Sequence, residues 1–514
     1  MARIVVLGAG LGGIQTALLL AQEGHDVTVL ERDPSPPPSS VEAQWSHWER
    51  PGIPHLRLTH FLLARWLQLA ETHLPALVRE IEQAGGVRVN TLTTDPSMRG
   101  PLMPADERFV TLTARRPVLE SAAVRAAAAV NIEVRRAVTC VGLAMVPGRT
   151  VPHVTGVVTR DAVVPADLVV DCTGRRSHLL TWLRAVGVSQ VQEEAAERGF
   201  TYYTRHFGSP DGRLPEATFR MLEQYGSLSA LRVPADNGTW SVGLVTRGDD
   251  RELRALRDEA TWTAAARQFT ELRPWVEAQP ITTGIQVMAG LKDRVLNLYD
   301  GRSPRVTGVV AVGDTWASTN PTLGRGLTIA LEHALCLRDA LRETGTDDAT
   351  ALAGRFGDTV RDRLMPLVRQ SAAYSAHRLA EMDGHETGVP YRHPEWSAQK
   401  ALALFSRDDT DALRALRAIA QLLPGAGEAL SAPITAAPLA HLTSPRTAQR
   451  PAVPNQPCGG VVAKASTMAD VVAALALRAE RLPLPGPSRS ELLAAMDTWP
   501  RTEGRSNAAA TSAS

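Results

Sequence analysis

The sequence predicts an α/β fold: a Rossmann-like domain with a parallel sheet, a second β-sheet domain inserted into it, and a helical C-terminal region. Three apolar runs carry this prediction. Residues 4–7 enter a glycine-rich turn, residues 167–171 lead into Cys-Thr-Gly, and residues 306–312 lead into Gly-Asp. Near-continuous apolar runs are typical of parallel strands that helices cover on both faces.

The first βαβ unit has the spacing of a dinucleotide site. Gly8 permits a sharp turn, Gly10 lets a pyrophosphate approach the backbone, and Gly13 lets helix and strand pack closely. The helix that begins there offers free N–H groups and a positive dipole end. The second strand, 27–30, ends at Glu31, whose carboxylate can accept hydrogen bonds from a ribose. The unit predicts a bound dinucleotide without saying which one.

Hydrophobic periodicity and turn signals assign the elements that follow. The hairpin signal Ala-Asp-Asn-Gly at 235–238 joins two of the expected strands. Strands are expected at 133–159, 167–171, 226–233, 239–246 and 306–312, and helices at 59–85, 116–130, 251–278, 326–341 and 346–424.

Composition excludes several classes of function. A net charge of +1 over 514 residues favours neither a nucleic acid nor a membrane surface as partner. The four cysteines are far apart and form no CxxC pair, which argues against a zinc site or disulfide framework and suits a reducing compartment. No apolar run approaches the roughly 20 residues that span a bilayer. Because the chain begins directly in a strand, we expect no signal peptide and a cytoplasmic protein.

Together the three strand ends resemble those of FAD-dependent monooxygenases with the para-hydroxybenzoate hydroxylase-like fold, within the glutathione-reductase type of flavoprotein. That family has GxGxxG, D-x-(A)-T-G and G-D motifs in this order, which Gly8 to Gly13, Asp171 to Gly174 and Gly313-Asp314 match. Arg50-Pro-Gly-Ile-Pro-His resembles the family's R-x-G-(V/I)-P-Q segment, and Arg116-Pro-Val-Leu-Glu its S-R-P-x-L-E helix start. The likeness is greatest to oxygenases and epoxidases of bacterial secondary metabolism.

The resemblance implies FAD as the cofactor and a division into four parts. The FAD-binding domain is discontinuous, at 1–180 and 290–345. An inserted substrate-binding sheet domain takes 181–289, a helical region 346–500, and a disordered tail 501–514.

Asp314 is expected to accept hydrogen bonds from the ribityl chain. The helix opened by Gly324-Arg325-Gly326 is expected to stabilise negative charge on the flavin. Asp171 contacts the cofactor or supports the fold. The residues assigned to the cofactor are Gly8, Gly10, Leu11, Gly12, Gly13, Glu31, Arg32, Arg50, Arg116, Asp171, Gly174, Gly313, Asp314, Pro321, Gly324, Arg325 and Gly326.

Three residues are candidates for the substrate pocket. Strand alternation points Tyr202 and Thr204 to one face, with ordinary sheet packing as the alternative. Trp316 follows the Gly-Asp motif, where the family has alanine or histidine, and is expected at the pocket rim. His55 and His60 lack the spacing of metal ligands, so no metal site is predicted.

For the reaction, the resemblance implies that reduced flavin and O₂ form a C4a-hydroperoxide. This species passes one oxygen atom to an apolar, electron-rich small molecule by hydroxylation or epoxidation. No acid–base pair stands out, so no catalytic residue is assigned, as expected where the cofactor supplies the chemistry. No second nucleotide unit is present, so NAD(P)H binds transiently or a separate flavin reductase delivers electrons. The protein is expected to be a monomer or homodimer.

Two other activities on this scaffold stay open: a reductase or dehydrogenase of prenyl or polyene substrates, and a non-redox cyclase. A halogenase is excluded, because it needs an early lysine and a W-x-W-x-I-P motif. The first lysine here is Lys292, and Trp45-Ser-His-Trp is not that motif.

Overall fold

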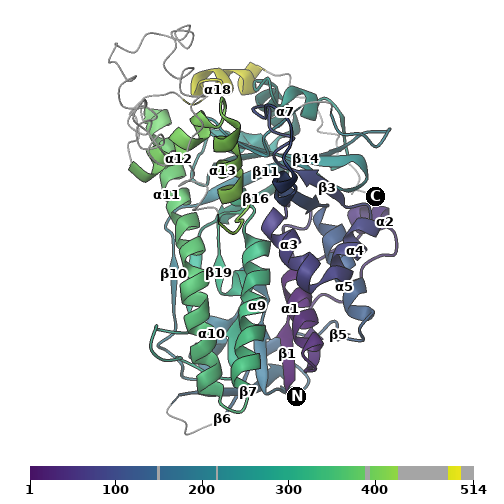
Figure 1. Cartoon of the computed structure of the whole chain (residues 1–514), viewed down its shortest axis with the longest axis vertical. Coiled ribbons are helices and arrows are strands. Elements are labelled where there is room, and N and C mark those ends of the chain that lie inside the picture. Colours follow the sequence, from purple (N-terminus) through teal and green to yellow (C-terminus); the bar gives the residue numbers. More distant parts are fainter. Residues whose placement is uncertain (147–150, 216–217, 388–393, 426–483, 485, 499–514) are drawn as a thin grey trace, which may run out of the picture.

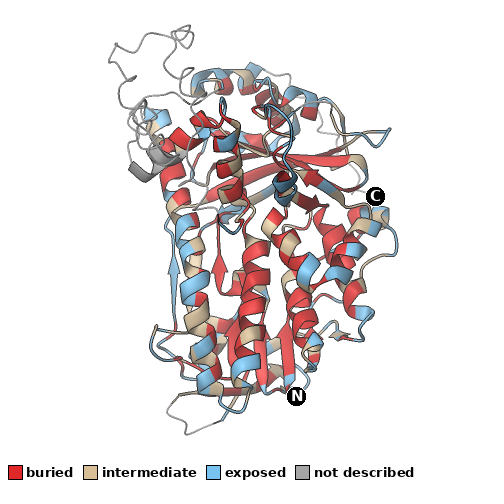
Figure 2. Ribbon diagram, in the orientation of Figure 1, coloured by how far each residue is buried: buried red, intermediate tan, exposed pale blue. Residues whose placement is uncertain are grey.

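The computed structural model describes residues 1–146, 151–215, 218–387, 394–425, 484 and 486–498. A parallel five-stranded sheet, in the order β18-β9-β1-β2-β5, forms the base of the molecule and confirms the predicted fold class. Four of its strands are largely apolar and largely buried (Figure 2). They are β1 (Arg3–Leu7), β2 (Asp26–Leu30), β9 (Leu168–Asp171) and β18 (Val309–Ala311). The edge strand β5 (Glu133–Arg135) exposes both of its charged residues.

Helices pack on this sheet and supply most of the main core. The first helix, α1, lies beside α9, which is more than 300 residues later in the chain (Figure 1). The predicted helices at 116–130 and 326–341 are therefore confirmed, as α5 and α9. The helices of this part are α1 (Leu11–Gln22), α2 (Val41–Ser46), α5 (Arg116–Ala128), α6 (Leu179–Ala185), α9 (Gly326–Thr344) and α10 (Ala349–Arg363).

Four predicted elements are divided in the structure, and the helical region expected at 346–424 is four separate helices in its described part. The helix expected at 59–85 is two helices, α3 (Ala64–His73) and α4 (Pro75–Gln83), because Pro75 has no N–H for the preceding helix. The helix expected at 251–278 is a 3₁₀ helix, Leu253–Arg257, followed by α7 (Glu259–Arg267) and α8 (Arg273–Val276). The strand region 133–159 contributes β5 to the parallel sheet. The rest of that region, β6 (Cys140–Val146) and β7 (His153–Thr159), pairs with β8 (Val163–Pro165) in a small antiparallel sheet.

The inserted sheet is antiparallel, in the order β12-β13-β14-β11-β15, with β16 also paired to β11. The predicted hairpin at 235–238 is confirmed, with Asn237 and Gly238 both at positive φ. One face of the sheet packs on an aromatic core that includes Tyr203, Trp240 and Trp262. The strands are β11 (Phe200–Gly208), β12 (Leu222–Gln224), β13 (Ser229–Pro234), β14 (Thr239–Arg247), β15 (Gln279–Pro280) and β16 (Gln286–Leu291).

Long helices run up the side of the molecule and over the inserted sheet (Figure 1). These are α11 (Met365–Thr387), α12 (Pro394–Phe405), α13 (Thr410–Ala420) and α18 (Arg489–Thr498). The remaining strands are β3 (Val87–Asn90), β4 (Val110–Thr113), β10 (Gln192–Ala195), β17 (Arg294–Asn297) and β19 (Ala317–Ser318). Among the described helices, none is long and apolar enough to cross a membrane. The predicted tail at 501–514 lies outside the described residues.

Candidate functional site

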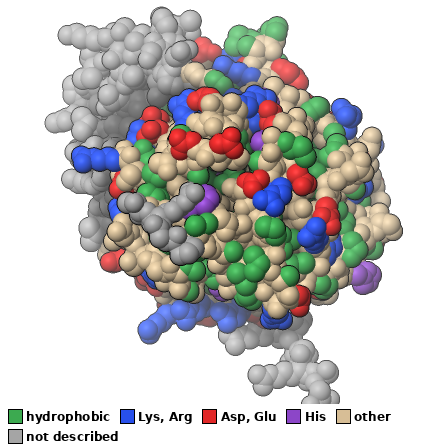
Figure 3. Space-filling view, turned by 90° about the horizontal axis from the view of Figure 1, so that it is seen from below, with side chains coloured by type: hydrophobic (Ala, Val, Ile, Leu, Met, Phe, Trp, Pro, Cys, Tyr) green, Lys and Arg blue, Asp and Glu red, His purple; other side chains and the backbone are tan. Residues whose placement is uncertain are grey.

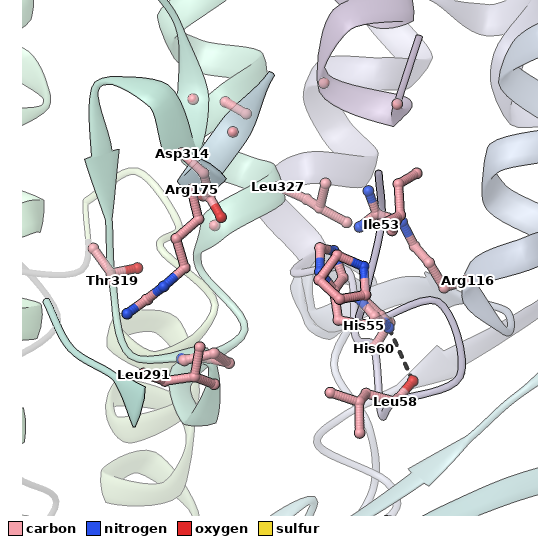
Figure 4. A pocket seen from close by; sticks show the side chains of 18 of the residues that line it. Ile53, His55, Leu58, His60, Arg116, Arg175, Leu291, Asp314, Thr319 and Leu327 are labelled. Atoms are coloured by element: carbon pink, nitrogen blue, oxygen red, sulfur yellow. Dashed lines mark hydrogen bonds between the residues drawn. The ribbon is translucent and has the colours of Figure 1, made fainter. Parts of the chain in front are cut away.

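A cavity of about 780 Å³ joins the glycine-rich turn to the inserted sheet. Its first end is lined by Gly8, Gly10 and Glu31, and its middle by Asp314 and the segment 319–327. Its far end lies against the sheet face opposite the aromatic core, at Tyr202, Thr204, Leu231 and Val233, and Met221 lines it beside them. In Figure 4, Asp314 and Arg175 lie on one side of the cavity and His55, His60 and Arg116 on the other.

The geometry of the first turn explains why three of its positions are glycine. Gly8 has φ +95°, and a Cβ on Gly13 would lie 1.9 Å from the Gly8 carbonyl oxygen, so helix and strand meet with no room for a side chain. A Cβ on Gly10 would meet no protein atom closer than 3.7 Å. The space in front of Gly10 is therefore part of the cavity.

Two helices begin at the wall of the cavity, and no side chain caps the N-terminus of either one. Neither α1 nor α9 has a capping side-chain hydrogen bond or an acidic residue in its first turn. Gly12 lines the cavity at the start of α1, and Gly326 lines it at the start of α9. Backbone N–H groups and positive dipole ends thus face the same cavity at two places, which suits a long ligand with negative charge at two positions.

Glu31 belongs to a buried charge network. Its Oε2 accepts hydrogen bonds from Ala9 N at 2.9 Å and Arg50 Nη2 at 2.8 Å, and its Oε1 accepts one from Asp33 N at 2.9 Å. Arg50 Nε donates to Asp33 at 2.9 Å. Arg50 Nη1 and Glu120 Oε2 have no hydrogen-bond partner among the described residues. These two atoms lie 3.9 Å apart as a buried ion pair, and the network fixes the Glu31 carboxylate at the cavity wall.

Asp314 and Asp171 end neighbouring strands but have different environments. Asp314 lines the cavity, and burial raises the pKa of its carboxyl against the effect of Arg116. Asp171 does not line the cavity; its Oδ1 accepts from Thr173 N at 2.8 Å and its Oδ2 from Ser177 Oγ at 2.6 Å. These hydrogen bonds fit the expectation that Asp171 supports the fold.

Of the other predicted site residues, most line the cavity and a few do not. Leu11 and Gly13 are buried behind the turn. Trp316 was expected at the pocket rim, and this is wrong: it lies in the core, 4.6 Å between ring centroids from His333. The predicted residues that line the cavity are Gly8, Gly10, Gly12, Glu31, Arg32, Arg50, Arg116, Gly174, Gly313, Asp314, Pro321, Gly324, Arg325, Gly326, Tyr202 and Thr204.

Tyr202 connects the inserted sheet to the loop before α9. Its hydroxyl donates to Asn320 Oδ1 at 2.5 Å, accepts from Thr322 N at 3.1 Å, and lies 2.7 Å from Thr322 Oγ1. Tyr203, the next residue, packs in the aromatic core instead, as strand alternation predicts. Tyr202 therefore ties the segment 320–324 to the inserted sheet.

His55 and His60 form a neutral pair in the cavity, with ring centroids 5.3 Å apart. Burial, and next Arg116, lowers the pKa of His55 well below its ordinary value and that of His60 to about 3. His60 Nδ1 lies 2.9 Å from the Leu58 carbonyl oxygen, which can only accept, so Nδ1 carries the proton (Figure 4). His60 Nε2 is then a hydrogen-bond acceptor. Among the described residues, no cluster could hold a metal ion.

Sequence reasoning missed part of the far end. Helix α13 contributes Arg417, Ala420 and Gln421, and Gln421 Oε1 accepts a hydrogen bond from Ala64 N, at the start of α3, at 2.7 Å. Leu231 and Val233 alternate along β13, so a period of two could have identified them. Nothing in the local sequence of α13 indicates that it reaches this cavity.

Known proteins resemble parts of this chain in sequence. Residues 6–69 match the family described as NAD(P)-binding Rossmann-like domain. "Protein Rv3254" of Mycobacterium tuberculosis (strain ATCC 25618 / H37Rv) is 29% identical over 66% of this chain and 72% of its own length. A D-amino acid dehydrogenase of Azorhizobium caulinodans is 39% identical, but over only 15% of this chain and 18% of its own length.

Solved structures resemble it over most of its length. PqsL, a probable FAD-dependent monooxygenase from Pseudomonas aeruginosa, has a TM-score of 0.55 at 17% identity and covers 74% of this chain and 98% of its own. A mutant 2-methyl-3-hydroxypyridine-5-carboxylic acid oxygenase has a TM-score of 0.53 at 16% identity, covering 80% and 98%. The flavin-dependent brominase Bmp2 has a TM-score of 0.53 at 15% identity, covering 74% and 89%. The predicted fold, that of the FAD-dependent monooxygenases, is confirmed.

Proposed function

We propose that this chain, whose fold is that of the FAD-dependent monooxygenases, binds FAD and transfers one oxygen atom from O₂ to a largely apolar small molecule. The observation that carries the proposal is the continuous cavity. It runs from a dinucleotide-type turn, past a second uncapped helix N-terminus, to an apolar chamber under a separate sheet.

The residues present fit FAD along this cavity. The open space at Gly10 and the start of α1 would hold the pyrophosphate, and Glu31 the adenosine ribose. Asp314 would accept hydrogen bonds from the ribityl chain, and the start of α9 would stabilise negative charge on the reduced ring. When bound, the flavin supplies the redox chemistry with O₂.

The far chamber supports oxygen transfer because its walls can exclude water. Met221, Leu231, Val233, Met288 and Leu291 line it. A reactive oxygen species needs such a dry site, since water would promote its breakdown before transfer. The neutral His60, as an acceptor, would orient a hydroxyl of the substrate. The described residues that line the cavity include no lysine, in keeping with the exclusion of a halogenase although Bmp2 shares the fold.

The test is to purify the protein, record a flavin spectrum, and follow NAD(P)H oxidation and O₂ uptake, with and without a flavin reductase, against candidate substrates. The expected result is bound FAD and O₂ uptake coupled to a product with one added oxygen atom. A product that differs by two hydrogens without coupled O₂ uptake would indicate the reductase or dehydrogenase, and an isomeric product the cyclase. A protein that binds no FAD would refute the proposal.

A further inference from the structure

One cation, Arg417 of α13, lies at the far end of the cavity, away from the segments that fit the cofactor. Its side chain is 13% exposed and lines the cavity together with Thr91, Thr94 and Met221. One terminal nitrogen binds Asp95 Oδ2, whereas Nε has no hydrogen-bond partner among the described residues. Arg417 therefore places a charged group at the cavity wall, and its hydrogen bond to Asp95 uses only one of its five N–H donors.

The acidic partner of Arg417 is shared. Asp95 Oδ2 also accepts from Arg220 Nε at 3.2 Å, and Asp95 Oδ1 accepts from Ser97 N at 2.8 Å. The next carboxylate, Glu223, pairs with Arg232 Nη2 at 2.8 Å and lies 3.5 Å from Arg220 Nη1. Three arginines therefore face two carboxylates, which leaves this cluster with one positive charge beside the cavity.

The apolar surroundings of Arg417 strengthen the attraction between its positive charge and an anion in the cavity. Leu222, Leu231 and Ala420 are apolar, and the histidine pair is neutral at physiological pH. An electrostatic contact is stronger in such a low-dielectric chamber than in water. The Gln421–Ala64 contact also fixes the end of α13, one helical turn beyond Arg417, so the guanidinium is held in position.

We infer that Arg417 anchors an anionic group of the substrate, a carboxylate or an equally charged acidic oxygen, at the end of an otherwise apolar molecule. This deepens the proposed function, on which it rests, and makes Arg417 a specificity-determining residue. The substrate class becomes an amphiphilic organic acid whose apolar part extends along Met221 and Leu231 toward the segment 319–327.

The test measures binding to the full-length protein as purified, by calorimetry, with matched probes: 1-naphthoate against 1-naphthalenemethanol, and decanoate against 1-decanol. The wild type is expected to bind at least one acid tenfold or more tightly than its alcohol, as expected of a charged hydrogen bond. Arg417→Gln should remove this preference while leaving affinity for the alcohols within about threefold.

Arg414→Gln is the matched control. Arg414 also ties α13 to the body of the protein, through Asp106 at 2.8 Å, but does not line the cavity, so this variant should keep the preference. Asp95→Asn separates anchoring from structural support. The variant frees Arg417 from its competing anion and should strengthen binding of the acid. If the Arg417–Asp95 pair is only structural, the variant should weaken acid binding or leave it unchanged.

The inference is overturned if no acid binds better than its alcohol, if Arg417→Gln keeps the preference, or if Asp95→Asn weakens acid binding or leaves it unchanged. A protein that prefers the acids but binds no FAD would refute the proposed function alone. A flavoprotein with coupled O₂ uptake and no acid preference would refute this inference alone.

Discussion

Gly13 is the residue whose identity the backbone constrains most directly. In Gly13→Ala, the new methyl group would overlap the Gly8 carbonyl oxygen, and neither backbone segment can move without separating α1 from β1. We expect a loss of about 3 kcal/mol or more in unfolding free energy, at the upper end of the range for overpacking. Urea denaturation of the wild type and variant measures this loss.

Gly354→Ala is the control for that experiment. Gly354 lies in α10, where a Cβ would meet no atom within 4 Å. Because alanine is the better helix former, the variant should be neutral or more stable by about 0.5–1 kcal/mol. Equal stability of Gly13→Ala and wild type would contradict the close packing described here.

Tyr202 and its neighbour allow a comparison within one strand. Tyr202→Phe removes the hydroxyl that binds Asn320 and Thr322, so the segment before α9 loses its tie to the sheet. If this segment contacts the flavin, the variant should bind FAD about tenfold more weakly, and its flavin absorbance bands should shift. Fluorescence titration of the apoprotein with FAD measures the affinity.

Tyr203→Phe makes the same chemical change on the opposite face of β11, in the aromatic core. It should leave FAD affinity and the absorbance bands unchanged. If both variants weaken FAD binding equally, the effect comes from β11 as a whole, and the role given to Tyr202 is wrong.

For single residues, the features that can be predicted from the sequence are those that depend on neighbours close by in the chain. Gly8 and Gly13 are set by one turn, and the face of Tyr202 by strand alternation, so both follow from local rules. The core position of Trp316 depends instead on His333 and on Phe356, whose ring is 5.0 Å from that of His333. Such contacts between distant segments are invisible to a local pattern.

At the element scale, the hairpin of β13 and β14 is joined to the N-terminus of α5 by a buried ion pair. Arg115 donates to Asp236 from its backbone N at 2.6 Å and from Nη2 at 2.7 Å, and both side chains are nearly inaccessible. In Asp236→Asn, the guanidinium stays buried without a counter-charge. We expect a loss of about 3–5 kcal/mol in unfolding free energy, measured by urea denaturation.

Glu343→Gln is the exposed counterpart, since Glu343 pairs with Arg355 between α9 and α10 with both side chains half exposed. Water already screens this pair, so the loss should be below about 1 kcal/mol. A similar loss in both variants would mean that burial of the Arg115–Asp236 pair is not what matters.

The elements themselves were easier to predict than their boundaries. The hairpin at 235–238 has a strong local signal, and so do the apolar strands β1, β2, β9 and β18 of the parallel sheet. Pro75 interrupts an otherwise continuous helical pattern, and Asp258 caps α7 by accepting from Thr261 N at 2.9 Å. Both residues are visible in the sequence, but hydrophobic periodicity alone passes over them. The placement of α13 over the cavity depends on Gln421 and Arg417, whose partners are more than 300 residues away.

At the scale of the whole molecule, positive and negative charges nearly balance, with a net charge of +1. On the face shown in Figure 3, acidic and basic side chains lie next to one another. The response of stability to pH should therefore depend strongly on buried titratable groups. Two of these groups lie deep in the fold, His206 on β11 and His333 on α9, both at most 2% exposed.

Burial lowers the pKa of both His206 and His333 to about 3, and Arg115 adds to the shift at His206. Above pH 6.5 neither the folded nor the unfolded state protonates these rings. Between pH 6.5 and about 3, the unfolded state takes up a proton at each ring and the folded state does not. Unfolding free energy must then fall as the pH falls, by about 1.4 kcal/mol per pH unit for each histidine.

His206→Phe tests this sign and size, because the Nδ1 of His206 has no hydrogen-bond partner among the described residues and a phenyl ring cannot titrate. In urea denaturation from pH 8 to pH 4.5, the wild-type and variant curves should run parallel above pH 7.5. Below pH 6 the variant should lose stability less steeply, by about 1.4 kcal/mol per pH unit. If the two curves stay parallel below pH 6, His206 is protonated in the folded protein, and its burial does not exclude the charge.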